Sequence, residues 1–330
     1  MVSQRYPLIG IAGTINHDFI KTGGYEYEDL GGILYNILGF HYLSDGKISI
    51  KPTANYGYDI KTPLFDYLKD KNNILPQGLS KINSLNPTVR LTDIGTEGKS
   101  EVLKHFLPVL SYDQLLYLNN CDIILINFIS GRDAESDTLR KLRESYHGII
   151  YIDIHSLTLG IRQDGSRYYR QPECWKQILG IADIVQMNLK ETLTLLGEVS
   201  KSPDSISDDG IVCLGESILS YGPNIFILTL GHKGATLFKK QNNQTGIFRS
   251  VSGNLKSTNG EATGCGDIFT SAFIVSILSD AGLQKSLDYS VAVASEKYKS
   301  PGLKQISLLN TYACSIPTNV GFSIDNVLSK

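Results

Sequence analysis

Apolar residues in the second half of the chain form short continuous runs, which are separated by stretches with helical periodicity. Runs of this length are typical of strands that are buried on both faces of a sheet. The predicted strands cover residues 123–126, 148–154, 181–187 and 225–230, and the predicted helices cover residues 133–146, 172–181, 189–197 and 211–221. Because strands and helices alternate, the pattern predicts βαβ units and a parallel, doubly wound α/β sheet.

The first half of the chain is less regular. Residues 7–13 predict a first buried strand that ends in a glycine turn, and residues 47–52 predict another strand. Residues 71–86 are polar and contain Asn and Pro, which is typical of a connection. Three weaker runs predict more exposed strands, of which the last two would form a hairpin: residues 21–30, 88–92 and 100–106.

Polar residues follow several of the predicted strands directly. In open α/β sheets, ligands bind beyond the carboxyl ends of the strands. We therefore expect these polar residues to share a single site. They are Asn16 and Asp18 after the first strand, Asn188 and Glu191 after residues 181–187, and Thr229 and Gly231 at the end of residues 225–230.

A further candidate is the segment Thr263-Gly264-Cys265-Gly266-Asp267, which precedes an apolar helical pattern. Small residues before a helix leave backbone N–H groups free, and together with the positive end of the helix dipole they can bind an anion. Asp267 could then accept a proton while the N–H groups hold a phosphoryl group. The alternative is that Asp267 caps the helix.

Two of the strand-end pairs also have structural alternatives. Asn188 and Glu191 have the spacing of a capping box, but a polar pair at this place could also hold phosphate and a hydrated Mg²⁺. Thr229 and Gly231 could bind the phosphate or ribose of a nucleotide, or they could simply begin a glycine hairpin turn. Taken locally, the structural interpretation is favoured for both pairs.

Residues 14–36 contain another polar set. Asn16 and Asp18 lie two residues apart, so in an extended segment both point to one side and could bind sugar hydroxyls. An Asx-rich turn is the alternative. Gly31 and Gly32 precede a predicted helix and would let a ligand approach the backbone closely. Asn36, inside that otherwise apolar helix, is either satisfied in the core or reaches a ligand.

Composition and missing motifs disfavour several classes of protein. The 330 residues carry a formal net charge of −2, which predicts binding neither to nucleic acid nor to an anionic membrane. No segment approaches the ~20 apolar residues of a membrane span, and the five scattered cysteines suggest neither a zinc site nor a disulfide framework. We therefore expect a soluble, cytoplasmic protein. The sequence has no P-loop and no well-placed G-x-G-x-x-G, which disfavours P-loop enzymes and dehydrogenases.

Five motifs occur in the order and spacing of one enzyme family: GTINHDFI, GGILYN, NLKE, TLGHKG and ATGCGD. On these motifs, the chain resembles the ribokinase-like (PfkB-type) carbohydrate and nucleoside kinases over residues 9–302, and the last motif is the most specific. The resemblance implies one domain over residues 1–330, with a three-layer αβα Rossmann-like sandwich and a mainly parallel sheet. It also implies a small β-sheet lid, built from residues 14–30 and 87–106.

The resemblance further implies a role for each motif. The activity would be that of an ATP-dependent kinase acting on a hydroxyl, expected to be a primary one, of a small sugar or nucleoside. The matched positions are Asp267 for the catalytic base; Gly264, Cys265 and Gly266 for the anion hole; Asn188 and Glu191 for phosphate and Mg²⁺, with Glu191 acting through water; Thr229, Gly231 and Gly234 for the nucleotide; and Asn16, Asp18, Gly31, Gly32 and Asn36 for the sugar.

The implied cofactors are ATP and Mg²⁺, with K⁺ as well in many members of the family. Glu261 and Ala262 depart from the Asp and Thr that are usual near the monovalent-cation site, and Ile33 replaces a Lys of ribokinases proper, which disfavours ribose. These departures motivate an alternative, a non-catalytic sugar- or nucleotide-binding protein that kept the fold. Lid edges often pair between subunits in this family, so the lid is a candidate homodimer interface.

Overall fold

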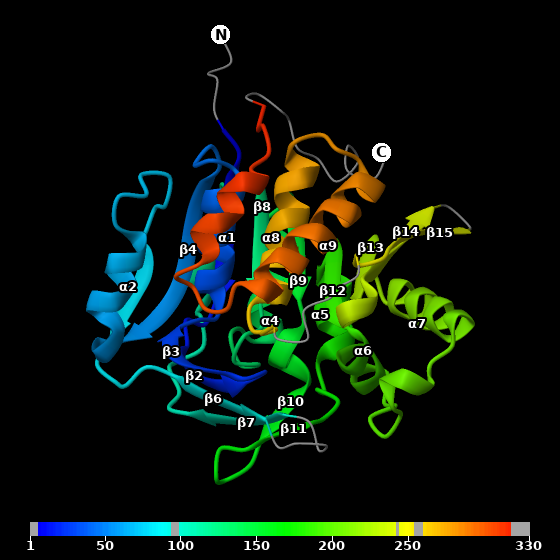
Figure 1. The fold of residues 1–330 in the computed structure, drawn as a ribbon, viewed down its shortest axis with the longest axis horizontal. Helices are drawn as coiled ribbons and strands as arrows, with labels where there is room; N and C mark the ends of the chain where they lie inside the picture. Colours follow the sequence, from blue (N-terminus) through cyan, green and yellow to red (C-terminus); the bar gives the residue numbers. More distant parts are fainter. Residues whose placement is uncertain (1–5, 94–98, 242–243, 254–259, 318–330) are drawn as a thin grey trace.

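The centre of the fold is a nine-stranded sheet with the strand order β15-β14-β13-β12-β9-β8-β1-β4-β5 (Figure 1). The computed structural model describes residues 6–93, 99–241, 244–253 and 260–317. From β13 to β5 all neighbouring strands are parallel, whereas β14 and β15 pair antiparallel at one edge, which confirms the predicted mainly parallel sheet. The strands are β1 (Leu8–Gly13), β4 (Ser49–Gly57), β5 (Gly78–Ile82), β8 (Ile123–Asn127), β9 (Ile149–Asp153), β12 (Ile184–Asn188), β13 (Ile225–Thr229), β14 (Ala235–Gln241) and β15 (Gln244–Ser250).

Helices cover both faces of this sheet. Apolar side chains alternate between the two faces of a strand, so a buried strand contributes to two cores. In β8, Ile123 and Leu125 pack in one core, while Ile124 and Ile126 pack in the other. The first core includes α1 (Ile33–Leu43), α2 (Lys61–Leu68), α8 (Cys265–Leu278) and α9 (Leu283–Lys299), and the second includes α3 (Tyr112–Leu116), α4 (Ser136–Ser145), α5 (Trp175–Ile181), α6 (Leu189–Leu195) and α7 (Asp208–Ser220).

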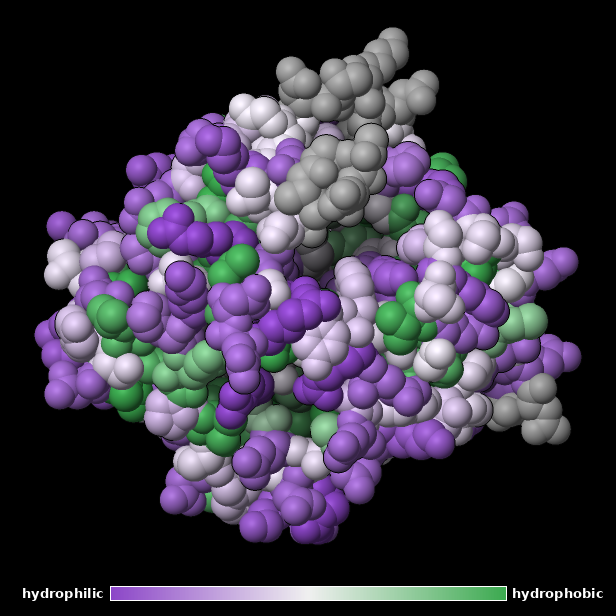
Figure 2. All heavy atoms as spheres, turned by 90° about the horizontal axis from the view of Figure 1, so that it is seen from below, coloured by the Kyte–Doolittle hydropathy of each residue, from purple (hydrophilic) through white to green (hydrophobic). Residues whose placement is uncertain are grey.

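A separate four-stranded sheet lies beyond the carboxyl ends of the main strands, at the bottom of the view in Figure 1, and we call it the lid. Its strand order is β3-β2-β6-β7, and two antiparallel hairpins are joined by the parallel pairing of β2 with β6. Seen from this side, the surface is largely hydrophilic, with hydrophobic side chains scattered among polar ones (Figure 2). The lid strands are β2 (His17–Thr22), β3 (Tyr25–Leu30), β6 (Thr88–Asp93) and β7 (Lys99–Lys104), all within the two segments expected to form it.

Several elements differ from the prediction. β4 does not end at residue 52 but continues to Gly57, because β1 pairs with its first half and β5 with its second. β5 lies in the segment predicted as a connection, since its partly exposed, polar sequence is that of an edge strand. Residues 21–30 are not one strand, because a turn at residues 23–24 divides β2 from β3. Helix α9 and the short hairpin of β10 (Leu159–Ile161) and β11 (Arg167–Tyr169) were not predicted.

In the described part of the chain, no helix combines the length and the apolar character that crossing a membrane requires.

Candidate active site

A cavity of about 800 Å³ lies between the lid and the carboxyl ends of the main strands. Its wall includes Asp153 from β9, Asn188 from β12 and Thr229 from β13, together with residues of three lid strands. Gly31 and Asn36 are the two predicted site residues that do not line it. The predicted residues that do are Asn16, Asp18, Gly32, Asn188, Glu191, Thr229, Gly231, Gly234, Gly264, Cys265, Gly266 and Asp267.

Asp267 lies in the first turn of α8 and faces the cavity. The N-cap residue of this helix is Gly264, so the alternative in which Asp267 caps the helix is wrong. Burial raises the pKa of the Asp267 carboxyl to about 6, although a hydrogen bond from Asn127 and the charge of Lys297 oppose the rise. The carboxylate is therefore ionised at neutral pH yet basic enough to accept a proton, as a general base must be.

The segment that leads into α8 and includes its first two residues, which we call the anion loop (residues 261–266), presents backbone N–H groups to the same cavity. Gly264 has a φ of 78°, and a Cβ at this position would lie 2.5 Å from the ring of Tyr35, so only glycine fits. Within the described residues the N–H groups of Gly264 and Gly266 have no hydrogen-bond partner, which leaves them available to an anion. By contrast, the N–H of Cys265 donates to the carbonyl of Ala262 at 3.0 Å. The available donors of the predicted anion hole are thus Gly264 and Gly266.

Asn127, the last residue of β8, holds Asp267 in place. Its Nδ2 donates to Asp267 Oδ1 at 2.7 Å and to Asn36 Oδ1 at 2.9 Å. Asn36 donates to the backbone carbonyl of Asp267 at 2.8 Å, so its amide is used inside the protein, behind the carboxylate. A hydrogen bond to an ionised carboxylate stabilises the charged form. Asn127 therefore helps to keep Asp267 ionised at neutral pH.

Asn188 and Glu191 form a capping box at the start of α6, which confirms that alternative. The N–H of Glu191 donates to Asn188 Oδ1 at 2.8 Å, and the N–H of Asn188 donates to Glu191 Oε2 at 2.8 Å. Asn188 Nδ2 also donates to Glu191 Oε1 at 2.5 Å. Burial raises the pKa of Glu191 to about 8, and the charge of Asp267 adds to the rise. Because both residues also line the cavity, the cap is compatible with the functional interpretation.

Asp153, the last residue of β9, is another buried carboxyl group in the cavity. Burial raises its pKa well above the usual range, and the charges of Glu191 and Asp267 raise it further. Gln186 donates to Asp153 Oδ2 at 3.0 Å and to the carbonyl of Gly266 at 3.2 Å, which ties the carboxyl group to the anion loop. Carboxyl groups that interact in this way fit a cation, and Mg²⁺ combines one or two carboxylates with water and phosphate oxygens. Because both oxygens of Glu191 already accept from Asn188, its contact with such an ion would be through water.

The described residues include no group of three or more His, Cys, Asp and Glu side chains that could hold a metal ion by themselves.

Asn16 and Asp18 line the cavity at the start of the lid and are almost completely buried, with exposures of 5% and 4%. Asn16 Oδ1 and Asp18 Oδ1 have no hydrogen-bond partner among the described residues. Buried oxygens of this kind require a donor, and the hydroxyl groups of a ligand can supply it. Gly31 packs directly against Asp18, because a Cβ on Gly31 would overlap Asp18 Oδ2. Gly31 therefore makes room for Asp18 instead of lining the cavity itself.

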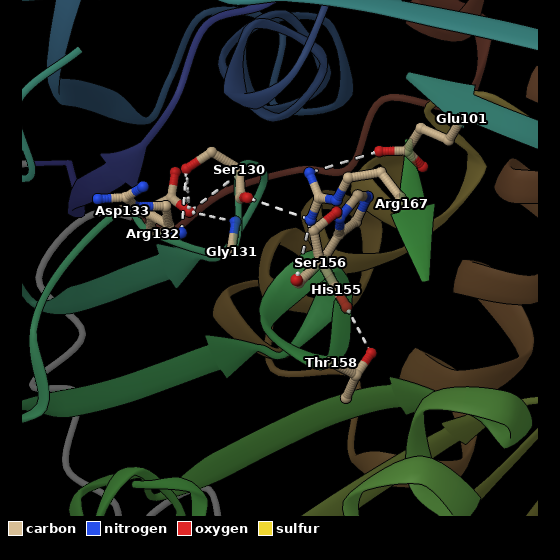
Figure 3. Close-up of polar contacts among 9 residues, drawn as sticks. All are labelled: Glu101, Ser130, Gly131, Arg132, Asp133, His155, Ser156, Thr158 and Arg167. Atoms are coloured by element: carbon tan, nitrogen blue, oxygen red, sulfur yellow. Dashed lines mark hydrogen bonds and ion pairs between the residues drawn. The ribbon is translucent and has the colours of Figure 1, made fainter. Parts of the chain in front are cut away.

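Arg167 of β11 connects the lid to the main domain (Figure 3). Its side chain is 2% exposed, and Nη1 lies 3.6 Å from Oε1 of Glu101, a β7 residue that lines the cavity. Nη2 donates to the carbonyls of Ser130 and Ser156 at 3.2 Å each (Figure 3). Burial, and then the charge of Arg167, lower the pKa of the neighbouring His155 to about 4, so this histidine is neutral at neutral pH. Arg167 thus holds Glu101 at the cavity wall.

Glu261 connects the anion loop to the lid. Its Oε1 accepts hydrogen bonds from the N–H of Thr263 at 2.8 Å, from Thr263 Oγ1 at 2.6 Å and from Thr22 Oγ1 at 3.2 Å. Its Oε2 accepts from the hydroxyl of Tyr27 at 2.9 Å. Thr22 ends β2 and Tyr27 lies in β3, so the carboxylate of Glu261 links the lid to the anion loop. An Asp side chain is one methylene shorter, and the Glu at this position provides the reach to the lid.

Thr229, Gly231 and Gly234 surround the turn between β13 and β14. The two strands are antiparallel, with Thr229 opposite Ala235, which confirms the hairpin alternative. The same three residues line the cavity, and helix α9 contributes Ala294 and Tyr298 to it. Backbone groups beside an aromatic and apolar wall suit a nucleotide, because a base can stack on the aromatic ring.

Comparison with known proteins identifies the fold. Residues 163–308 match the family model of the pfkB family carbohydrate kinases. The chain is similar to the solved structure of a pyrophosphate-dependent kinase in the ribokinase family, with a TM-score of 0.76 and 18% identity, over 93% of this chain and 100% of that chain. The chain has the ribokinase fold. The resemblance drawn from the motifs is thereby confirmed.

Two ribokinases share this ribokinase fold with the chain. The structure of Arabidopsis thaliana ribokinase, complexed with ribose and ATP, has a TM-score of 0.67 and 17% identity over 98% of each chain. Thermotoga maritima ribokinase has a TM-score of 0.64 and 16% identity, also over 98% of each chain. No curated protein matches the chain significantly by sequence.

Some residues of the site were not predicted from the sequence. Asn127 directly follows the predicted strand at residues 123–126, so its position at a strand end could have identified it, whereas Gln186 is marked only as a polar residue inside an apolar run. Glu101 and Arg167 come from segments far apart in the chain, and no local pattern marks them. Lys297 lies on the unpredicted helix α9.

Proposed function

We propose that the chain is an ATP-dependent kinase that phosphorylates a hydroxyl group of a small, uncharged sugar or nucleoside. The observation that carries the proposal is the placement of Asp267, a buried carboxylate with a pKa of about 6 beside free backbone N–H groups. A base next to an anion site suits phosphoryl transfer, in which a hydroxyl loses its proton as it attacks phosphorus. The pfkB family match and the ribokinase fold support a carbohydrate kinase in general.

In the proposed mechanism, the acceptor hydroxyl gives its proton to Asp267 while its oxygen attacks the γ-phosphorus. The N–H groups of Gly264 and Gly266 stabilise the charge on the transferred group, and one such donor is typically worth about 10²–10³ in kcat. Asp153 and Glu191 would hold Mg²⁺, which neutralises phosphate charge when it is bound. Closure of the lid excludes water and so limits hydrolysis of the donor.

An uncharged acceptor is favoured by the charges of the cavity. None of the described residues that line it is a lysine or an arginine. A phosphate ester in the acceptor position would therefore meet carboxyl groups without a lysine or arginine side chain in the cavity wall to pair with it. Free carboxyl and amide oxygens instead accept hydrogen bonds from hydroxyl groups. The acidic residues that line the cavity are Asp18, Glu101, Asp153, Glu191 and Asp267.

ATP is the proposed donor because the cavity continues from the anion loop to a wall that suits a nucleoside. Gly231, Ala294 and Tyr298 belong to that wall. Pyrophosphate is the alternative donor, since three of the similar solved structures are of kinases described as pyrophosphate-dependent. Pyrophosphate would bind only at the anion loop and near Asp153 and Glu191, and would leave the nucleoside wall without a contact.

The test is a screen of phosphotransfer with two donors. The purified chain is incubated with Mg²⁺ and either ATP or pyrophosphate, against sugars, cyclitols, nucleosides and their phosphate esters, and products are detected by mass spectrometry. We expect ATP-dependent product from an uncharged acceptor and none from its phosphate ester. Product with pyrophosphate alone would replace ATP as the donor. Ligand-induced shifts of the melting temperature without product from any pair would favour the non-catalytic binding protein.

A further inference from the structure

Lys297 is a completely buried lysine behind the anion loop, and the proposed mechanism leaves its charge without a role. Its exposure is 0%, and it does not line the cavity. Its Nζ donates to the carbonyl of Thr263 at 3.0 Å and lies 5.3 Å from the centre of the Tyr35 ring. Burial lowers the pKa of the Lys297 ammonium, and the charges of Cys265, Glu261 and Asp267 oppose that shift and favour the charged form. A buried ammonium is costly unless negative groups compensate it, so this placement calls for an explanation.

The same loop is where the family resemblance implies a monovalent cation such as K⁺. A bound K⁺ needs several oxygen atoms directed at one point. Here the carbonyl of Thr263 already accepts from Lys297, and both oxygens of Glu261 accept from Thr22, Thr263 and Tyr27. A second cation beside the buried ammonium would also be repelled by it. The residues present therefore do not fit a monovalent ion.

We propose that the ammonium group of Lys297 supplies, as part of the chain, the positive charge that a monovalent cation would otherwise bring to the anion loop. The inference rests on the proposed kinase function and adds that this kinase needs no K⁺. The ammonium fixes the carbonyl of Thr263 directly before Gly264, and so sets the direction of the N–H groups that face the cavity. It also favours the ionised form of Asp267. Because Lys297 acts through these groups, it is a positioning residue.

The first test uses the unmodified protein. Phosphotransfer is measured with K⁺, NH₄⁺, Na⁺ or choline as the only monovalent cation, at constant ionic strength. We expect the same kcat and KM in all four. A kcat that rises several-fold when K⁺ replaces choline would overturn the proposal.

The second test compares Lys297→Met, which removes the charge and fills the space, with Lys297→Ala, which also leaves room for an ion. Both should lower kcat by about 10²-fold, as the loss of one anion-hole donor does, with a smaller change in KM. K⁺ or NH₄⁺ should restore part of the kcat of Lys297→Ala but not that of Lys297→Met. Lys299→Met is the matched control, because Lys299 lies on the same helix but is exposed, where it pairs with Glu296. A wild-type kcat in both Lys297 variants would overturn the proposal.

Two further measurements distinguish a positioning role of Lys297 from a role in packing alone, and test Lys297 independently of the proposed kinase function. The acid limb of kcat/KM should move to higher pH in Lys297→Met, since Asp267 loses a neighbouring positive charge. If no donor and acceptor give turnover, the kinase function fails, but melting temperature still tests Lys297. K⁺ should then raise the melting temperature of Lys297→Ala, relative to choline, and leave that of the wild type unchanged. An equal response of both proteins would overturn the inference. If neither variant folds, the cation dependence of the wild type decides.

Discussion

Replacing Asn127 with Leu should shift the acid limb of the pH–rate profile to higher pH. Asn127 Nδ2 donates to Asp267 Oδ1 at 2.7 Å, and this bond is the largest effect that opposes the rise of the pKa on burial. Leu has the same branching and the same number of side-chain heavy atoms as Asn, but it cannot donate a hydrogen bond. The substitution therefore keeps the site filled but removes the hydrogen bond that holds the pKa of Asp267 down, so burial should raise that pKa further.

The size of the shift follows from the strength of the bond. A hydrogen bond to an ionised group is worth about 1.5–3 kcal/mol, and one pKa unit corresponds to about 1.4 kcal/mol, so the pKa should rise by about 1–2 units. From about 6 in the wild type, the pKa of Asp267 would reach about 7–8. The ionised fraction at pH 7 then falls from about nine-tenths to between about one-half and one-tenth. Because the base acts only when deprotonated, activity should be lost earlier as the pH falls.

The assay is kcat/KM for the acceptor across the acidic and neutral range. Ser271→Ala is a suitable control, because Ser271 donates to the backbone carbonyl of Asp267 at 3.0 Å and not to its carboxylate. Its acid limb should stay where the wild-type limb lies, near pH 6. A lower rate at every pH in Asn127→Leu, with an unmoved acid limb, would refute the assigned role of Asn127 in stabilising the charge.

Three further variants test other parts of the site. Asp267→Asn should lower kcat by about 10²–10⁴-fold while calorimetry still detects donor binding, and unchanged turnover would remove Asp267 as the base. Burial raises the pKa of Asp267 to about 6, so the stability that the protonated side chain contributes at low pH is lost as the pH rises through that value. Asp267→Asn should therefore melt at a higher temperature than the wild type at neutral pH. Tyr27→Phe removes a lid hydrogen bond to Glu261 and should raise the acceptor KM about 10-fold and increase ADP release without acceptor; normal values of both would count against closure through this contact. Gly31→Ala should displace Asp18 and raise the acceptor KM alone, whereas an equal rise in the donor KM would indicate a general disturbance.

The parts of the fold that the sequence predicts well are those in which local pattern and burial agree. The strands β8, β9, β12 and β13 are covered on both faces, so their apolar runs are continuous and easily seen. β5 is an edge strand and α9 carries polar residues on much of its surface, so neither has such a run. The capping box of Asn188 and Glu191 was also visible, because both partners lie within one helical turn.

The parts of the site that the sequence does not show depend on contacts between distant segments. Glu101 meets Arg167 only because β7 packs against the β10–β11 hairpin. Lys297 reaches the carbonyl of Thr263 only because α9 packs beside α8. Asn36 shows the opposite case, since the sequence left core and ligand roles open and the fold places it behind Asp267. The sequence shows where polar residues occur, but which residues they contact depends on tertiary packing.

The carboxylate of Glu261 has a consequence for the order in which the protein meets its ligands. It accepts hydrogen bonds from Thr22 and Tyr27 of the lid and from Thr263 of the anion loop. Because these bonds join the lid to the loop where the donor phosphate would bind, an acceptor that holds the lid in this position also holds the loop. Reciprocity then requires that each ligand raise the affinity of the other by the same factor. One methylene group, the difference between Glu and Asp, would thereby make the binding of two substrates synergistic.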